Sequence, residues 1–230
     1  MILRLPMLLL ATLTATTAMA APVTRSFSAT GFDKVVASGS ETITIVTGKA
    51  ASVTATGEAD RLDRLRIGVE DGTLKIDHKS GSDWSWGTGD GVKIVVTMPA
   101  LYSVHGSGSG DITADSGTGP NFAASSSGSG DVRVMRINSP AVSLRTSGSG
   151  DMEAAGQCTN ASVKISGSGN MALANLACRD IDIAVSGSGD VAARATGNAA
   201  VRISGSGDVD IAGGARCTSR TSGSGDVTCS

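Results

Sequence analysis

The chain has 230 residues, and its 19 Lys and Arg against 21 Asp and Glu give a formal net charge of −2. This balance excludes a protein that binds nucleic acid through bulk positive charge. Hydrophobic residues make up 40% of the chain, but aromatic residues make up only 3% and 31 positions are glycine, which excludes a core built on large aromatic rings.

Residues 1–20 have the pattern of a secretory signal peptide. One basic residue, Arg4, precedes an apolar run from Leu5 to Leu13, and the segment ends in Ala18-Met19-Ala20, an A-x-A cleavage site. The run is shorter than the roughly 20 residues needed to span a bilayer, so we expect no transmembrane anchor; a buried core helix is the alternative. The sequence therefore predicts an exported protein that is periplasmic, on the cell surface or extracellular.

Residues 21–105 contain short alternations of apolar and polar residues, which predict β-strands. Their apolar positions are Ile43 and Ile45, Val53 and Ala55, Leu65, Ile67 and Val69, Leu74 and Ile76, and Val92, Ile94, Val96 and Met98. Asp71-Gly72 predicts a turn between two of the strands, whereas Leu62 and Leu65 also allow one helical turn. We expect this part to begin the fold and to cap its first coil, because an uncovered sheet end invites aggregation.

Trp84 and Trp86 form an aromatic cluster in a polar, glycine-rich segment between Lys79 and Gly91. Two indoles on one face of an extended segment can stack on a sugar ring or hold a protein partner. They are therefore candidate binding residues, and the alternative is that they cover the apolar end of the fold.

From residue 106 onward the pentapeptide Ser-Gly-Ser-Gly-Asp recurs, once with Asn in place of Asp. The last residues of the seven copies are Asp111, Asp131, Asp151, Asn170, Asp190, Asp208 and Asp226, separated by 20, 20, 19, 20, 18 and 18 residues. A flexible Gly/Ser linker has no reason to keep such a spacing, so the pentapeptide marks a structural repeat over residues 106–230.

Apolar residues recur at fixed offsets from the last residue of each copy. One residue after it stand Ile112, Val132, Met152, Met171, Val191, Val209 and Val227, and seven before it stand Val104, Ala124, Leu144, Val163, Ile183, Val201 and Ser219. These offsets are odd, as in a β-strand that buries every second residue. Since one coil cannot bury its apolar face alone, the repeats must stack. The sequence predicts an all-β fold, a parallel β-helix or β-solenoid with about 18–20 residues per coil.

The even offsets would then face solvent. They carry Ser at offsets −4 and −2, the acidic residue at 0, and at −6 a mostly basic column with Arg145, Lys164, Arg202 and Arg220. If the chain bends at the glycines, this phase reverses and the serines form ladders inside the coil.

The acidic column is a further candidate binding site, formed by Asp111, Asp131, Asp151, Asp190, Asp208 and Asp226. Carboxylates one strand spacing apart repel each other by about 0.9 kcal/mol in water and about 3.5 kcal/mol at an effective dielectric constant of 20. Water, the basic column, hydrogen bonds or Ca²⁺ between coils can relieve this repulsion. Because the calcium-binding nonapeptide of other solenoids is not matched, we interpret the aspartates as turn-stabilising residues and expect no metal or cofactor.

The four cysteines fall at offsets that predict two disulfides in an exported protein. Cys158 and Cys178 both lie twelve residues before the next acidic or amide position, on adjacent coils, within reach of a disulfide. Cys217 and Cys229 take inward offsets in the last coil. Redox or metal chemistry is the alternative, but no CxxC pattern or neighbouring histidine supports it.

Several segments in order resemble the head GIN domain family, whose members are described as auto-transporter adhesins. They are Gly31-Phe32-Asp33-Lys34-Val35, Asp71-Gly72-Thr73-Leu74-Lys75-Ile76, Met98-Pro99-Ala100-Leu101 and the serial Gly-Ser-Gly-Asp copies. The resemblance covers about residues 30–230. It implies an exported bacterial protein with a β-helical fold and a surface or adhesive role, and it supplies no catalytic residues.

We therefore expect a non-catalytic binding protein, adhesin-like, whose partner is a glycan, a cell-surface protein or an envelope protein and not a nucleic acid. His78 and His105 are the only histidines and have no nucleophile or metal-ligand spacing around them, so triad, zinc and phosphate-loop chemistry lack their residues. A polysaccharide-active enzyme, a calcium-stabilised structural protein and an ice- or mineral-templating surface are the alternatives. The sequence does not set the oligomeric state.

Overall fold

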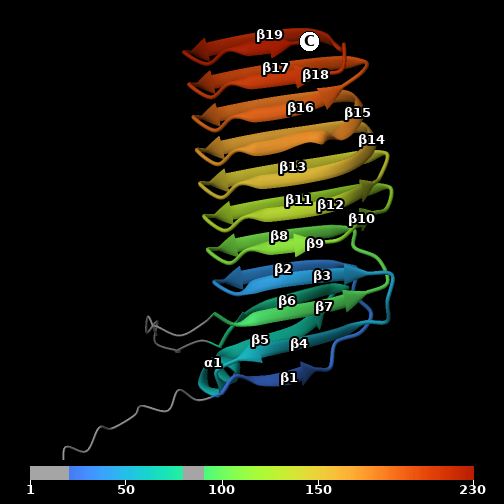
Figure 1. The fold of residues 1–230 in the computed structure, drawn as a ribbon, viewed down its shortest axis with the longest axis vertical. Coiled ribbons are helices and arrows are strands. Elements are labelled where there is room, and N and C mark those ends of the chain that lie inside the picture. Colours follow the sequence, from blue (N-terminus) through green and yellow to red (C-terminus); the bar gives the residue numbers. More distant parts are fainter. Residues whose placement is uncertain (1–20, 80–90) are drawn as a thin grey trace, which may run out of the picture.

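Strands from successive repeats stack along one axis in the computed structural model, which describes residues 21–79 and 91–230 (Figure 1). Each coil contributes to two walls. The first wall contains β8 (Ser103–Gly108), β11 (Asn121–Gly128), β13 (Ala141–Gly148), β17 (Asn198–Gly205) and β19 (Arg216–Gly223). The second contains β9 (Ile112–Ala114), β12 (Val132–Asn138), β16 (Val191–Ala195), β18 (Val209–Ala212) and β20 (Val227–Cys229). The short β10 (Gly117–Thr118) follows β9 and pairs with the end of β12. Two strands, β14 (Met152–Gly167) and β15 (Met171–Gly187), run through both walls.

The register places each repeat directly on the preceding one. Ser127 is paired with Ser107 on one side and with Ser147 on the other, in parallel strands. The same column continues through Ser166, Ser186, Ser204 and Ser222. This arrangement confirms the predicted all-β parallel solenoid.

The core is made of the odd-offset columns. Val132 at offset +1 is 1% exposed and Leu144 at offset −7 is fully buried, and the equivalent residues are buried until the last coil. The serines at −4 and −2 and the acidic residues at 0 lie outside, nearly all of them exposed. The predicted outward phase is therefore confirmed, and the reversed phase with internal serine ladders is wrong.

The chain turns sharply at the glycines of each repeat, where stacked coils leave no room for a side chain. A Cβ atom at Gly148 would lie 2.2 Å from the carbonyl oxygen of Gly128, and φ at this position is +131°. Gly150 has no positive φ, but its Cβ atom would lie 2.2 Å from the carbonyl oxygen of Gly130. Glycine is required here because the backbones of adjacent coils touch.

At the N-terminal end the strands do not stack in chain order. The first coil, β2 (Lys34–Gly39) and β3 (Thr42–Thr47), lies between β8 and β9 on one side and β6 (Thr73–His78) and β7 (Lys93–Met98) on the other, all in parallel register (Figure 1). Beyond these, β4 (Ser52–Gly57), β1 (Val23–Phe27) and β5 (Leu65–Glu70) add antiparallel pairings. The sequence did not predict this insertion or the antiparallel pairing of β4 with β1 and β7.

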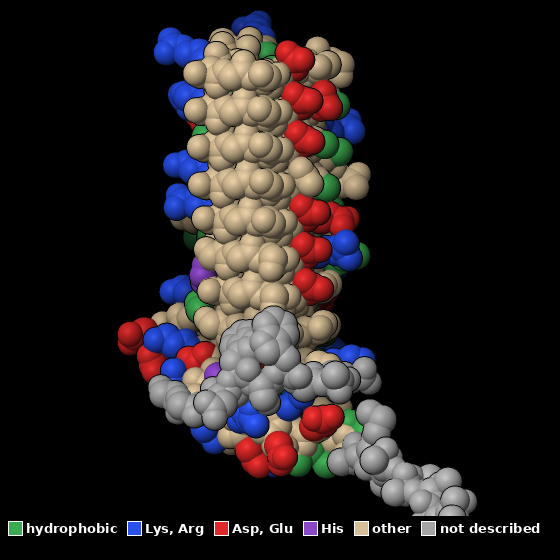
Figure 2. Space-filling model, turned by 90° about the vertical axis from the view of Figure 1, so that its left-hand side faces the viewer, with side chains coloured by type: hydrophobic (Ala, Val, Ile, Leu, Met, Phe, Trp, Pro, Cys, Tyr) green, Lys and Arg blue, Asp and Glu red, His purple; other side chains and the backbone are tan. Residues whose placement is uncertain are grey.

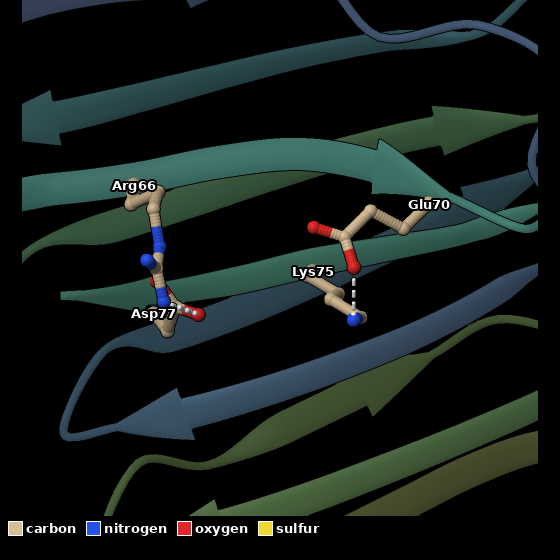
Figure 3. A network of polar contacts seen from close by, with 4 residues as sticks. All are labelled: Arg66, Glu70, Lys75 and Asp77. Carbon is tan, nitrogen blue, oxygen red and sulfur yellow. Dashed lines mark hydrogen bonds and ion pairs between the residues drawn. The ribbon is translucent and has the colours of Figure 1, made fainter. Parts of the chain in front are cut away.

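A short helix and a tight hairpin close this end. The helix α1 (Ala59–Arg64) buries Leu62, whereas Leu65 begins β5. In the turn between β5 and β6, φ is +48° at Asp71 and +70° at Gly72, which confirms the predicted two-residue turn. Two cross-strand ion pairs, Arg66–Asp77 and Lys75–Glu70, lie on the exposed side of the hairpin (Figure 3).

Within residues 21–79 and 91–230, no helix is both long and apolar enough to cross a bilayer. The predicted signal peptide, residues 1–20, lies outside the described residues, as do Trp84 and Trp86.

Candidate binding surface

The predicted aspartate column forms a continuous ladder along the outer corner of the solenoid. In each step the backbone N–H of one acidic or amide residue donates to Oδ1 of the equivalent residue one coil earlier. The N···O distances are 2.9 Å for Asp131 to Asp111, 2.8 Å for Asp151 to Asp131, 2.7 Å for Asn170 to Asp151, 3.0 Å for Asp190 to Asn170, 2.8 Å for Asp208 to Asp190 and 2.8 Å for Asp226 to Asp208.

Backbone geometry explains why this position needs an acceptor. The carbonyl oxygen of Gly128 already accepts hydrogen bonds from the N–H groups of Ser149 at 2.8 Å and Gly150 at 3.1 Å. The next N–H, that of Asp151, therefore bonds to the side chain of Asp131. Asn170 fits the same ladder because its amide oxygen accepts the bond equally well.

The carboxylates thus have a structural role, whether or not they also bind a ligand. In every aspartate of the column that is followed by another coil, one carboxylate oxygen accepts a hydrogen bond from the backbone of that coil. Among the residues that the structure describes, no group of three or more Asp, Glu, His or Cys side chains is arranged to hold a metal ion.

A basic column accompanies the serines on the outer side of the first wall. Its positions at offset −6 are His105, Ser125, Arg145, Lys164, Ala184, Arg202 and Arg220. Arg202 pairs with Asp182 at 3.2 Å, and His105 Nδ1 lies 2.7 Å from the hydroxyl of Ser125. Arg145 and Lys164 are exposed and have no ion-pair or hydrogen-bond partner in the described part of the chain.

A groove of about 550 Å³ runs beside this column across five coils. Its lining comes from offsets −6, −5 and −4. Arg145, Lys164 and Arg202 lie at offset −6 and the serine column at −4, and between them the column at −5 is mostly apolar, with Ile165, Val185 and Ile203. Figure 2 shows the charge distribution around it: Lys and Arg side chains follow one edge of the solenoid, acidic side chains follow the other, and a strip of other residues and backbone separates them.

A second hollow of about 560 Å³ lies on the first wall, where its strands begin. It is lined in part by Asn160, Asp180 and Arg216. Asp180 bonds to Arg179, and this hydrogen bond is the main reason why the pKa of Asp180 lies below its usual value. Its Oδ1 also accepts from the N–H of Asn198 at 2.9 Å. The same kind of aspartate-to-backbone hydrogen bond thus occurs once at a second corner.

Sequence reasoning missed one further polar contact, which joins the first coil to β6. Ser38-Gly39-Ser40-Glu41-Thr42 is a full-length but altered copy of the repeat, in which Glu41 and Thr42 take the places that Gly110 and Asp111 take in the next coil. Glu41 is 6% exposed and pairs with His78 Nε2 at 2.9 Å. The pairing of Ser38 with Ser107 could have been found by allowing substitutions at the last two positions of the pentapeptide.

Both predicted cysteine pairs are bonded. Cys158 and Cys178 occupy equivalent positions on β14 and β15, with Cα atoms 4.5 Å apart. Cys217 and Cys229 join β19 to β20 in the last coil, with Cα atoms 6.7 Å apart. The second bond closes the coil whose inward positions, Ser219 and Thr221, are exposed and polar.

Comparison with solved structures finds the same fold in several bacterial proteins. A "putative adhesin" from Bacteroides fragilis is 22% identical, with a TM-score of 0.84 over 91% of this chain and 97% of the other. A "putative lipid binding protein" from Parabacteroides distasonis is 23% identical, with a TM-score of 0.74 over the same shares. A "putative adhesin" from Parabacteroides merdae is 17% identical, with a TM-score of 0.69 over 91% of this chain and 96% of the other.

Among curated proteins, no sequence matches this chain. The family model described as "Putative auto-transporter adhesin, head GIN domain" matches residues 31–215. This range includes the first coil, the N-terminal strands from β4 to β7 and almost all of the repeats. The chain therefore belongs to the head GIN domain family.

Proposed function

We propose that this protein is an exported, adhesin-like binding protein without catalytic activity, which holds its partner on the outer face of the first wall. The observation that carries this proposal is the groove across five coils, bordered by the cations of Arg145 and Lys164, which lack partners in the described structure. Membership of a family described as adhesins and the fold shared with such proteins support it.

The partner classes are a glycan, a cell-surface protein or an envelope protein. The pattern of residues 1–20 and the two disulfides support export to the periplasm, the cell surface or the exterior. In this proposal residues 21–105 cap the solenoid and residues 106–230 present the binding face. The exposed edge of the aspartate ladder and the pair Trp84 and Trp86 remain candidate contact residues.

A polysaccharide-active β-helix enzyme is the second candidate, because acidic side chains line up beside a glycan-sized groove. A glycosidase needs two carboxylates placed on either side of one scissile bond, whereas here each aspartate repeats the position of the previous one. We therefore rank binding above catalysis. A calcium-stabilised structural role predicts instead that added Ca²⁺ raises the melting temperature and that a chelator lowers it.

The proposal is tested with the mature protein, residues 21–230, produced in an oxidising compartment so that both disulfides form. The protein is applied to a glycan array and to immobilised bacterial envelope and surface fractions, and the same glycans are assayed for cleavage. Saturable binding without cleavage supports the proposal. Cleavage of a bound glycan, or no saturable binding to any of these surfaces, overturns it.

A further inference from the structure

We propose that the groove beside the basic column binds a linear, negatively charged polysaccharide, such as a polyuronate, that lies along the solenoid axis. This inference rests on the proposed function and names the chemical class of its ligand. It follows from the charge, the spacing and the lining of the groove.

The charge is available for a ligand. Arg145 and Lys164 follow one another in adjacent coils, and neither has an acidic partner among the described residues. Arg202, two coils further along, is held by Asp182 at 3.2 Å. The aspartate ladder lies across the strip of serine and glycine, on the other edge of the corner (Figure 2). The groove side therefore carries a local excess of positive charge on a chain whose net charge is −2.

The spacing suits a polymer. Equivalent side chains of adjacent coils are separated by one strand spacing, about 4.8 Å, and this distance is close to the length of one sugar unit in an extended polysaccharide. Arg145 and Lys164 are one strand spacing apart. Lys164 and Arg202 are two strand spacings apart, because Ala184 lies between them in the column. A chain with one carboxylate per sugar can therefore meet successive cations without changing direction.

The lining suits sugar hydroxyls. Five serines at offset −4, of which Ser147, Ser166 and Ser186 are central, border the groove and are exposed. Their hydroxyl groups have no side-chain hydrogen-bond partner within the described residues. Each hydroxyl can both donate and accept, so the column offers a repeated contact for hydroxyl groups that repeat at the same interval.

The same lining argues against single-stranded nucleic acid. Proteins that bind it combine a basic groove with aromatic side chains on which the bases stack, and the lining residues of this groove include no aromatic side chain. The observations therefore favour an anionic glycan.

The experiment measures the dissociation constant for a galacturonic acid oligomer of defined length by isothermal titration calorimetry. The native protein is compared with the double variant Arg145→Ser/Lys164→Ala, whose new residues already occur in the same column as Ser125 and Ala184. The matched control is Arg136→Ser/Arg194→Ala, which removes the same charge from exposed positions of β12 and β16 in the second wall. Circular dichroism and melting curves verify that all three proteins are folded.

We expect saturable binding by the native protein and the control, weakening as salt is added, and a loss of at least about tenfold in the groove variant, since two charge-assisted contacts disappear. Equal loss in both variants, equally tight binding of a neutral dextran, or tighter binding of a single-stranded oligonucleotide overturns the inference. Absence of oligomer binding also overturns it. The proposed function would survive any of these results if the glycan array or the envelope fractions still bound the protein.

Discussion

Asp131 illustrates how one side chain connects the sequence repeat to the fold. Its Oδ1 atom accepts the N–H of Asp151 from the next coil, while its own N–H donates to Asp111. The residue at this position must supply an oxygen, but the oxygen need not be charged, as Asn170 demonstrates. The regular acidic column therefore reflects a backbone requirement that recurs in successive coils from Asp111 to Asp226.

We expect Asp131→Ala to be less stable than Asp131→Asn by about 1 kcal/mol, because alanine leaves the N–H of Asp151 without its acceptor. Both substitutions remove the same charge, so the comparison isolates the hydrogen bond from the repulsion along the column. Urea unfolding of the two variants measures the difference, and equal stabilities would show that the ladder contributes nothing.

Asp77, in the N-terminal part of the molecule, makes a contribution to the stability of the fold that depends on pH. Arg66 bonds both of its carboxylate oxygens, at 2.6 and 2.8 Å, and this hydrogen bonding is the main cause that lowers the pKa of Asp77 (Figure 3). Because the pKa is lower in the folded protein, the pair stabilises the fold above the ordinary aspartate pKa, about 3.9, and this stabilisation is lost as the pH falls through the lower folded value.

The stability difference between the native protein and Asp77→Asn should therefore be larger at about pH 6 than near pH 2. Arg66→Gln should produce the same profile, since it removes the other half of the pair. Unfolding curves across this range, taken at constant ionic strength, test the expectation. A difference that is independent of pH would mean that the ion pair does not contribute.

The corner of each coil, from offset −4 to offset 0, is the element that sets the repeat. Its two glycines allow the backbones of adjacent coils to touch, its serines face solvent, and its last residue caps the following coil. The phase of the apolar columns could be predicted because apolar and polar residues alternate in the same way in every copy of the repeat. The groove could not, since it depends on how the side chains at offsets −6 and −4 stand above the column at −5 in five stacked coils.

Gly150→Ala is expected to destabilise the protein by about 3 kcal/mol or more, because its Cβ atom would overlap the carbonyl oxygen of Gly130 and force two coils apart. The control is Gly68→Ala in β5, where a Cβ atom meets nothing within 4 Å and φ is not in the left-handed region. This control should stay within about 0.5 kcal/mol of the native stability. Thermal melts of both variants make the comparison, and similar losses would contradict the close contact between coils.

The N-terminal strands show where prediction from sequence fails. Alternation identified β4, β5, β6 and β7, but it carries no information about which strand lies beside which. The coil of β2 and β3 lies between later segments of the chain. Its copy of the pentapeptide is hard to recognise, because Glu41 stands where Gly110 stands one coil further on. Without a repeated motif, register depends on long-range contacts that local patterns do not encode.

For the whole molecule, one residue pattern yields parallel columns of different chemistry. Stacking places an acidic ladder, a serine strip and a basic groove side by side on one elongated body (Figure 2). The cysteines follow the same register, since Cys158 and Cys178 are equivalent residues of adjacent coils. Every statement about faces, ladders and ligand spacing therefore depends on direct stacking of equivalent residues.

Disulfide trapping between engineered cysteines tests this stacking most directly. Ser147 and Ser166 are paired on adjacent coils, and one strand spacing, about 4.8 Å, lies within the Cα range of a disulfide. We predict that Ser147→Cys/Ser166→Cys forms an intramolecular bond under mild oxidation, read by mass spectrometry of non-reduced peptides. Ser127→Cys/Ser166→Cys, two coils or about 9.6 Å apart, should stay reduced in the folded protein. Failure of the first pair to close, or closure of both pairs with equal ease, would contradict the account.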